Sequence, residues 1–156
     1  MKSVRIEKRG EPLPQGYVLD ASSLFELFFL SSDQKILPIL GNSFILDLTL
    51  YEIGSILNKG KDNRIRGLDN EKVLALSGEF SRVLGAIERI HLDPEDLKRV
   101  LLLPLEKNLT FYDAAYILQS RKLNLPLVTN DRKMASAGKS AGITVKKAED
   151  LAHECA

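Results

Sequence analysis

The chain has 156 residues, about the size of one domain, and its 44% hydrophobic residues support a sizeable core and exclude a disordered chain. Lysine and arginine (22) balance aspartate and glutamate (21), so a net charge of +1 excludes a uniformly basic coat or an acidic tail, although a local basic patch remains open. A single cysteine, Cys155, and only two histidines argue against a disulfide framework and against a cysteine or histidine metal site.

The first 16 residues are polar and basic, and glycine and proline interrupt any regular pattern. We predict that residues 1–16 are an N-terminal extension without a core and that residues 17–156 form the domain. The chain has no secretory signal and no apolar run near the roughly 20 residues that span a bilayer. We therefore expect a soluble, cytoplasmic protein with no membrane segment.

From residue 17 onward, short apolar segments alternate with segments of helical periodicity. In chain order we predict a strand at 17–20, a helix at 22–30, a strand at 43–48, a helix at 49–58, a helix at 68–87, a strand at 87–92, a helix from Pro94 that Pro104 kinks or ends, a helix at 111–122, a strand at 125–129, a helix at 131–138 and a strand at 143–145. This order predicts an α/β protein with a mainly parallel sheet that helices cover on both faces.

Several catalytic and nucleotide-binding motifs are missing from the sequence. It contains no glycine-rich phosphate loop and no G-x-S-x-G nucleophile motif. Acidic residues, however, lie near the ends of several predicted strands. Asp20 closes the first strand, Glu52 lies in the first turn after the second, and Asp131 follows the strand at 125–129. Because ligands of open α/β sheets bind at the carboxyl ends of the strands, these acids are candidates for one site, and Asp113, in the first turn of its helix, could join them.

Helix capping is the alternative explanation for three of these acids. Thr49-x-x-Glu52 and Thr110-x-x-Asp113 both fit the capping-box pattern, and Asp131 fits an N-cap. Asp20 has no evident capping role. Asp113 lies in a segment that is apolar nearly all around, with no lysine or arginine within a helical turn, so its carboxylate needs a partner or a metal. Four carboxylates in one cleft would repel one another, and oxygen ligands select hard ions such as Mg²⁺ or Mn²⁺.

The sequence resembles the PIN-domain ribonucleases, in particular the VapC-like toxins of prokaryotic toxin–antitoxin systems. The resembling segments are VLDAS at 18–22, DLTLYEI at 47–53, LTFYDAAY at 109–116 and LPLVTND at 125–131. The resemblance implies a three-layer α/β/α sandwich and an endoribonuclease that cleaves RNA through a metal-activated water, with Mg²⁺ or Mn²⁺ as cofactor. It also implies a cognate antitoxin and a homodimer as partners.

By motif position, the resemblance makes Asp20, Glu52, Asp113 and Asp131 both catalytic residues and metal ligands. Asp20 and Asp113 would be the principal ligands. Thr129 matches the family's hydroxyl position, and Asn130 lies beside the fourth acid; we assign both to substrate positioning. Ser55 stands where many relatives have asparagine, and the N-terminal extension is atypical.

A basic segment at 59–66 holds four cations against one acid. It is either a solvated loop or a patch that steers phosphate, in which case Lys61, Arg64 and Arg66 would position the substrate. Asp47 is expected to be structural, and we find no helpful neighbour for His91 or His153.

Two other functions remain possible at this point. A catalytically silent PIN-like RNA-binding or assembly module would have no need for all four acids. A receiver-like phosphoacceptor would need an adjacent acidic pair after the first strand, and Leu19-Asp20-Ala21 lacks one.

Overall fold

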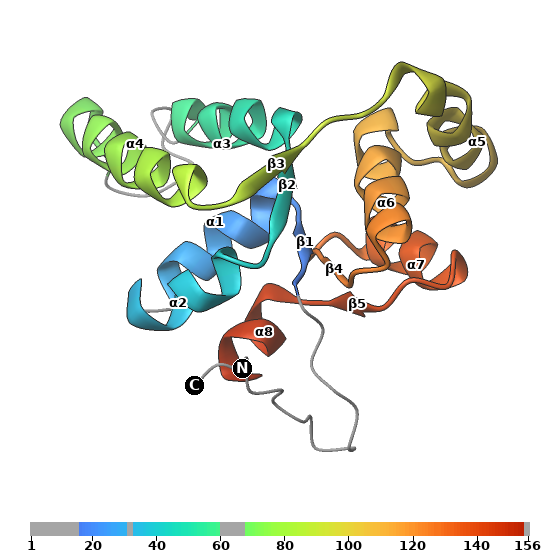
Figure 1. Cartoon of the computed structure of the whole chain (residues 1–156). Coiled ribbons are helices and arrows are strands. Elements are labelled where there is room, and N and C mark those ends of the chain that lie inside the picture. The colour runs from blue at the N-terminus through green and yellow to red at the C-terminus, as the bar shows by residue number, and fades with distance from the viewer. Residues whose placement is uncertain (1–15, 31–32, 60–67, 155–156) are drawn as a thin grey trace.

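The computed structural model describes residues 16–30, 33–59 and 68–154, and within these residues five short strands form one parallel sheet (Figure 1). The strands are β1 (Val18–Leu19), β2 (Phe44–Leu46), β3 (Glu88–Ile90), β4 (Leu127–Val128) and β5 (Val145–Lys146). Their order across the sheet is β3-β2-β1-β4-β5, and every pairing is parallel. The predicted α/β class and parallel sheet are confirmed.

Helices lie on both sides of this sheet. They are α1 (Ala21–Leu30), α2 (Asp33–Leu40), α3 (Asp47–Lys59), α4 (Asn70–Gly85), α5 (Leu97–Lys107), α6 (Phe111–Leu123), α7 (Arg132–Ser140) and α8 (Ala148–Glu154), with a single 3₁₀ turn, η2, at Pro94–Asp96. In Figure 1, α1 to α4 and α8 stand on one side of the strands and α5 to α7 on the other, so the molecule is a three-layer sandwich. Among the described residues, no helix is long and apolar enough to cross a membrane.

Alternate side chains along the central strands fill two separate cores. Leu19 and Val128 belong to the core under α1, α2, α3, α4 and α8, whereas their neighbours Val18 and Leu127 belong to the core under α5, α6 and α7. This two-residue alternation is what a strand buried on both faces produces, because successive side chains point to opposite faces. All four of these side chains are fully buried.

Several helices differ from the sequence prediction, and two of the differences involve a proline. Pro104 was expected to kink or end its helix, and it does not end it: α5 continues through Pro104 to Lys107, and its C-cap is Asn108, whose φ of 52° is left-handed. A proline removes one backbone hydrogen bond, and packing of α5 on α6 around the buried Val100 outweighs that loss. The helix α2 was not predicted, and Pro38 lies inside it.

The parallel arrangement brings four polar residues to one edge of the sheet. Asp20 directly follows β1, Asp47 follows β2, His91 follows β3 and Thr129 follows β4. The paired residues Val18 with Phe44 and Leu46 with Ile90 keep the strand ends nearly level. Side chains that are far apart in the sequence therefore meet at the carboxyl edge.

Candidate active site

Asp20 is a buried carboxylate at the end of the central strand. It is 4% exposed, and its Oδ1 accepts a 2.8 Å hydrogen bond from the backbone N–H of Ser23 and a longer one from the Ser22 hydroxyl. Its Oδ2 accepts a 2.5 Å hydrogen bond from the hydroxyl of Thr129. We expected no capping role for Asp20, and that expectation is wrong. Because β1 ends at Leu19 and α1 begins at Ala21, Asp20 is the single residue between them and acts as the N-cap of α1.

Thr129 connects the first acid to the fourth. Its buried hydroxyl donates to Asp20 and accepts from the backbone N–H of Asp131 at 3.1 Å. Asp131 is exposed and caps α7, because its Oδ1 accepts from the N–H of Met134 at 2.7 Å. The predicted N-cap at Asp131 is confirmed. The described structure joins Asp131 to the other acids only through Thr129.

The side chain of Asn130 forms two hydrogen bonds within the protein. Its Nδ2 donates to the carboxylate of Glu26 on α1, and its Oδ1 accepts from the N–H of Ala148 at the start of α8. The segment after β4 is thereby held to two helices of one layer.

Glu52 receives its hydrogen bond from another helix. The hydroxyl of Tyr116 on α6 donates to Glu52 Oε2 at 2.6 Å, and the same hydroxyl lies 2.7 Å from the Oγ1 of Thr49. The capping-box alternative for Thr49 and Glu52 is wrong, because α3 begins at Asp47, two residues earlier than predicted. Thr49 is thus inside the first turn, where its Oγ1 accepts from the N–H of Leu46.

Asp113 has both a capping role and an electrostatic one. Together with Thr110 it forms the predicted capping box: the Thr110 hydroxyl accepts from the N–H of Asp113 at 3.1 Å, and Asp113 Oδ2 accepts from the N–H of Thr110 at 3.4 Å. The carboxylate is half-buried at the start of α6 and acts on Glu52 across the space between α3 and α6.

The pKa values show which acids the structure brings together. Burial raises the pKa of Asp20, although its hydrogen bonds from Ser23 and Thr129 oppose the change. Burial also raises the pKa of Glu52, and the negative charges of Asp20 and Asp113 raise it further against the hydrogen bond from Tyr116. Three of the four predicted acids therefore share one electrostatic environment, and Asp131 is not among the charges that act on Glu52.

The side chains of these three acids offer the oxygen ligands that hard divalent ions prefer. The atoms that would bind the ion are all carboxylate oxygens, and in the described part of the chain none of the three acids forms an ion pair with lysine, arginine or histidine. As the side chains stand, no three acidic, histidine or cysteine groups among the described residues are close enough to hold one ion. A cation would offset the repulsion that raises the pKa of Glu52, so the chemistry of these side chains fits such an ion, whereas their spacing in this structure does not yet bring three of them onto one ion.

Two residues of this edge were missed by sequence reasoning. In the sequence, Tyr116 looks like an ordinary core residue of a buried helix. Its position three residues after Asp113 nevertheless places it on the same side of α6 as that acid. Its pKa is raised by burial and by Glu52, so the hydroxyl keeps its proton and acts as donor. We also found no neighbour for His91, and this is wrong: its Nδ1 contacts Oδ2 of Asp47.

Some predicted residues are not placed by the structure. Lys61, Arg64 and Arg66 of the basic segment lie outside the described residues, as do residues 1–15 of the predicted extension.

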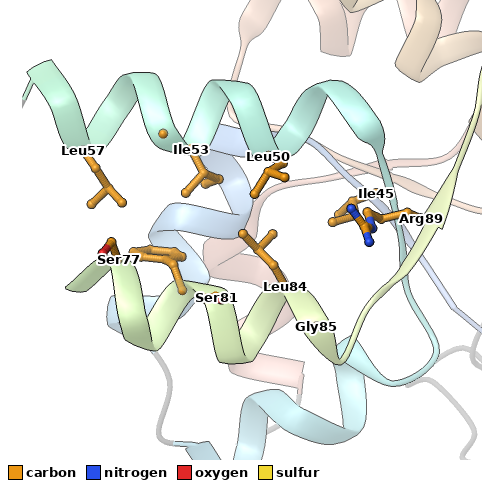
Figure 2. Close-up of a pocket in the computed structure, with 11 residues that line it drawn as sticks. Ile45, Leu50, Ile53, Leu57, Ser77, Ser81, Leu84, Gly85 and Arg89 are labelled. Carbon is orange, nitrogen blue, oxygen red and sulfur yellow. The ribbon is translucent and has the colours of Figure 1, made fainter. Parts of the chain in front are cut away.

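The apolar groove in Figure 2 is separate from the acids. It lies between α3 and α4 and has a volume of about 370 Å³. Apolar side chains such as Leu50, Ile53 and Leu84 line it, and Arg89 stands at the end near the sheet. None of the four predicted acids contributes to its lining. The candidate active site is therefore the acidic edge of the sheet and not this groove.

Comparison with known proteins agrees with this architecture. The sequence profile of the PIN domain matches residues 17–140. The chain is 33% identical over 129 residues to "Exonuclease VapC9" of Pyrobaculum aerophilum, an alignment that covers 83% of this chain and 90% of the relative. It is also 33% identical over 91 residues to "Ribonuclease VapC3" of the same organism, covering 58% of this chain and 66% of the relative.

Solved structures share the fold. PAE2754 from Pyrobaculum aerophilum superposes with a TM-score of 0.74 at 28% identity, over 90% of this chain and 94% of that one. A toxin–antitoxin complex from Klebsiella pneumoniae contains a chain with a TM-score of 0.54 at 17% identity, over 78% of this chain and 91% of that one. At that identity the second likeness shows the fold alone.

Proposed function

This chain belongs to the PIN-domain family, and we propose that it is a nuclease toxin that hydrolyses RNA phosphodiester bonds at the acidic edge of its sheet. The names of the two relatives, an exonuclease and a ribonuclease, support phosphodiester hydrolysis and an RNA substrate. Family membership also removes the receiver-like alternative.

The observation that carries the proposal is the shared environment of Asp20, Glu52 and Asp113. They come from three separate segments, and burial and the negative charges of Asp20 and Asp113 raise the pKa of Glu52, with no lysine or arginine of the described residues among the groups that act on it. A chain that only needed to fold would be more stable with neutral side chains at such positions. Perturbed acids that converge at the carboxyl edge of an α/β sheet are typical of a functional site.

In this proposal Asp20, Glu52 and Asp113 hold Mg²⁺ or Mn²⁺, and Asp131 completes the negative pocket or holds a second ion. A divalent ion lowers the pKa of a water molecule and offsets the negative charge that develops on the phosphate. The protein supplies fixed oxygen atoms. Thr129 and Ser23 orient the two oxygens of Asp20, and Tyr116 fixes Oε2 of Glu52, which leaves Oε1 able to accept a proton from the attacking water.

Of the residues assigned to substrate positioning, Thr129 and Asn130 belong to the described structure, and the three basic residues lie outside it. Thr129 acts through Asp20, because its hydroxyl is already committed to that carboxylate and to the N–H of Asp131. Asn130 lies beside Asp131 and is held by Glu26 and Ala148. Lys61, Arg64 and Arg66 would bind phosphates along the RNA backbone, and this part of the proposal rests on their charge alone.

The proposal includes internal cleavage of RNA and two protein partners. A cognate antitoxin would inhibit the nuclease, and a second copy of the chain would form a homodimer; the toxin–antitoxin complex of the same fold supports the first partner. The alternative is a catalytically silent PIN-like module that binds RNA or assembles with other proteins.

The test uses purified protein with unstructured RNA, once as a linear strand labelled at its 5′ end and once as a closed circle. We expect both forms to be cleaved with Mg²⁺ or Mn²⁺ and neither to be cleaved in EDTA. Cleavage of the linear strand alone would replace internal cleavage by exonuclease action. Binding without cleavage under every metal condition would favour the silent module.

The partner proposals need separate measurements. Light scattering during gel filtration should give twice the mass of one chain if the homodimer forms. The protein encoded by an adjacent small open reading frame, if it is the antitoxin, should copurify with this chain and abolish cleavage.

A further inference from the structure

The imidazole of His91 lies at the same edge of the sheet as the acids and contacts an aspartate. His91 directly follows β3, and its Nδ1 contacts Oδ2 of Asp47, which directly follows β2. The side chains are 75% and 46% exposed, so the pair lies at the surface. An ionised carboxylate can only accept, so Nδ1 is the donor in this contact, and the contact orients the ring.

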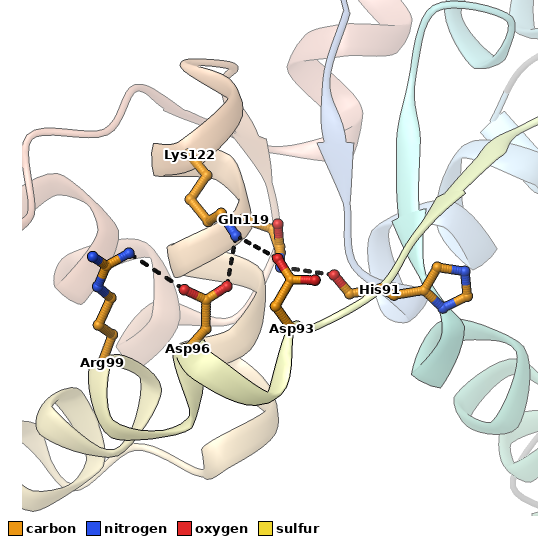
Figure 3. A network of polar contacts seen from close by, with 6 residues as sticks. All are labelled: His91, Asp93, Asp96, Arg99, Gln119 and Lys122. Atoms are coloured by element: carbon orange, nitrogen blue, oxygen red, sulfur yellow. Dashed lines mark hydrogen bonds and ion pairs between the residues drawn. The ribbon is translucent and has the colours of Figure 1, made fainter.

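The backbone of His91 also forms a hydrogen bond, to a residue of α6. The buried Gln119 of α6 donates from Nε2 to the backbone oxygen of His91 at 3.2 Å. Just beyond, Lys122 of α6 pairs with Asp93 at 3.2 Å and with the buried Asp96 at 2.6 Å. Figure 3 shows that the imidazole points away from this polar network. His91 is thus anchored to α6 through its backbone and to α3 through its ring.

One polar atom of the ring is left for a ligand. In the described part of the chain, Nε2 of His91 has no hydrogen-bond partner. Of the four residues that directly follow β1 to β4, only His91 can carry a positive charge, since the others are Asp20, Asp47 and Thr129. A phosphate oxygen accepts hydrogen bonds and needs a donor, and the other three residues offer it carboxylates or a hydroxyl that is already committed.

The distance to the acidic cluster suits a neighbouring part of one RNA strand. Adjacent strands of a sheet are about 4.8 Å apart, and β3 lies two strands from β1, so His91 and Asp20 are separated by roughly 10 Å across the edge. Tyr51, one helical turn after Asp47 on α3, is 78% exposed and offers a ring on which a base can stack. Both Tyr51 and His91 are thus tied to Asp47, one by helical spacing and one by contact, and an aromatic ring near an imidazole favours a nucleotide over a small inorganic anion.

We propose that His91, held by Asp47, is a positioning residue that donates a hydrogen bond from Nε2 to a backbone phosphate of the RNA next to the scissile bond. Donation from both ring nitrogens, to Asp47 and to the phosphate, requires a proton on each of them, so the proposed contact is one between an imidazolium and two anions. This inference rests on the proposed function.

The measurement is the salt dependence of RNA binding. A short unstructured RNA is titrated with the full chain carrying Glu52→Gln, in EDTA so that no cleavage accompanies binding, over a range of salt concentrations. Each phosphate contact on a single strand contributes about 0.7 to the slope of log K against log salt. Adding His91→Gln should therefore reduce the slope by about 0.7 and weaken binding by about tenfold at low salt.

His153 supplies a matched control. It is 78% exposed, and its Nε2 lies 3.9 Å from Glu149 one turn away, so it is also an exposed histidine beside a carboxylate, but on α8. His153→Gln should leave the slope and the affinity unchanged. His91→Lys should restore most of the slope, because the ammonium group replaces the charge, whereas a merely structural role for the imidazole would not be restored.

Two results would overturn the inference while leaving the nuclease proposal intact. One is a slope for His91→Gln equal to that for His153→Gln. The other is a failure of His91→Lys to restore the slope in a protein that circular dichroism shows to be folded. Absence of RNA binding by the Glu52→Gln protein, together with absence of cleavage by the unmodified chain, would overturn both proposals.

Discussion

Tyr116 donates a 2.6 Å hydrogen bond to Glu52, a residue 64 positions earlier in the chain. The same hydroxyl lies 2.7 Å from Thr49, so a single group joins α6 to the first turns of α3. Glu52 is pushed toward its neutral form by burial and by two other carboxylates, and the bond from Tyr116 is the contact that opposes this. The tyrosine therefore links the stability of the helix pair to the charge of the proposed active site.

Replacing this hydroxyl should affect both stability and chemistry. Tyr116→Phe keeps the ring but removes the donor to Glu52 and the partner of the buried Thr49 hydroxyl, so we expect a loss of about 1–2 kcal/mol in the free energy of unfolding. The pKa of Glu52 should rise further, since its stabilising hydrogen bond is gone. Urea unfolding measures the first effect, and the pH dependence of cleavage measures the second. An unchanged pH profile would contradict the assigned role of Tyr116.

Asp20→Asn should cost folding stability as well as activity. Asparagine is as good an N-cap as aspartate for Ser23, but its amide nitrogen would face the Thr129 hydroxyl, which now donates to Asp20. The buried hydroxyl of Thr129 would lose its acceptor, and we expect a destabilisation of about 1–3 kcal/mol. Thermal unfolding in EDTA checks this. A melting temperature equal to that of the unmodified protein would show that Thr129 does not depend on Asp20.

The raised pKa of Glu52 gives a pH dependence with a definite sign. A carboxyl whose pKa is higher in the folded than in the unfolded state binds more protons when folded, so its contribution to stability is present below its unfolded value, 4.5 for Glu52, and is lost as pH rises through the folded value. In EDTA, the unmodified protein should therefore lose stability relative to Glu52→Gln as pH rises from about 4 toward neutrality. Urea unfolding of both proteins at each pH gives the difference. A constant difference, or one of opposite sign, would contradict the account.

Asp113→Asn separates the two roles of its carboxylate. The asparagine oxygen can still accept from the N–H of Thr110, and the substitution removes a negative charge that acts on Glu52. Without metal we expect the free energy of unfolding to stay within about 0.5 kcal/mol of the unmodified value. With Mg²⁺, the gain in melting temperature should be smaller than for the unmodified protein. An equal gain would remove Asp113 from the proposed metal ligands.

The sequence predicts the parallel sheet, and the position of Asp20 at its carboxyl edge, because both depend on short-range patterns and one topological rule. Apolar runs mark the strands, and the carboxyl ends of parallel strands meet at one edge whatever the details of packing. The capping functions of Asp113 and Asp131 follow from local spacing in the same way. These features could be predicted without knowing which helices touch.

The features that were missed depend on boundaries and on long-range contacts. The N-cap role of Asp20 requires α1 to begin at the residue after the strand, and sequence patterns leave such boundaries uncertain by a few residues. The start of α3 at Asp47 likewise removes Thr49 from its predicted capping box. The contact of His91 with Asp47 exists only because β2 and β3 pair in register at Leu46 and Ile90. None of these follows from local composition.

The most direct test of the central claim is the single-turnover rate of RNA cleavage by Glu52→Gln with Mg²⁺. Glu52 has no capping role, and glutamine retains an oxygen that accepts from Tyr116, so the substitution disturbs folding less than Asp20→Asn. It removes one negative charge from the proposed metal site, and we expect the rate to fall about a hundredfold or more while circular dichroism shows a folded protein. A folded Glu52→Gln protein that cleaves RNA at the unmodified rate would contradict the assignment of catalysis to the acidic edge of the sheet.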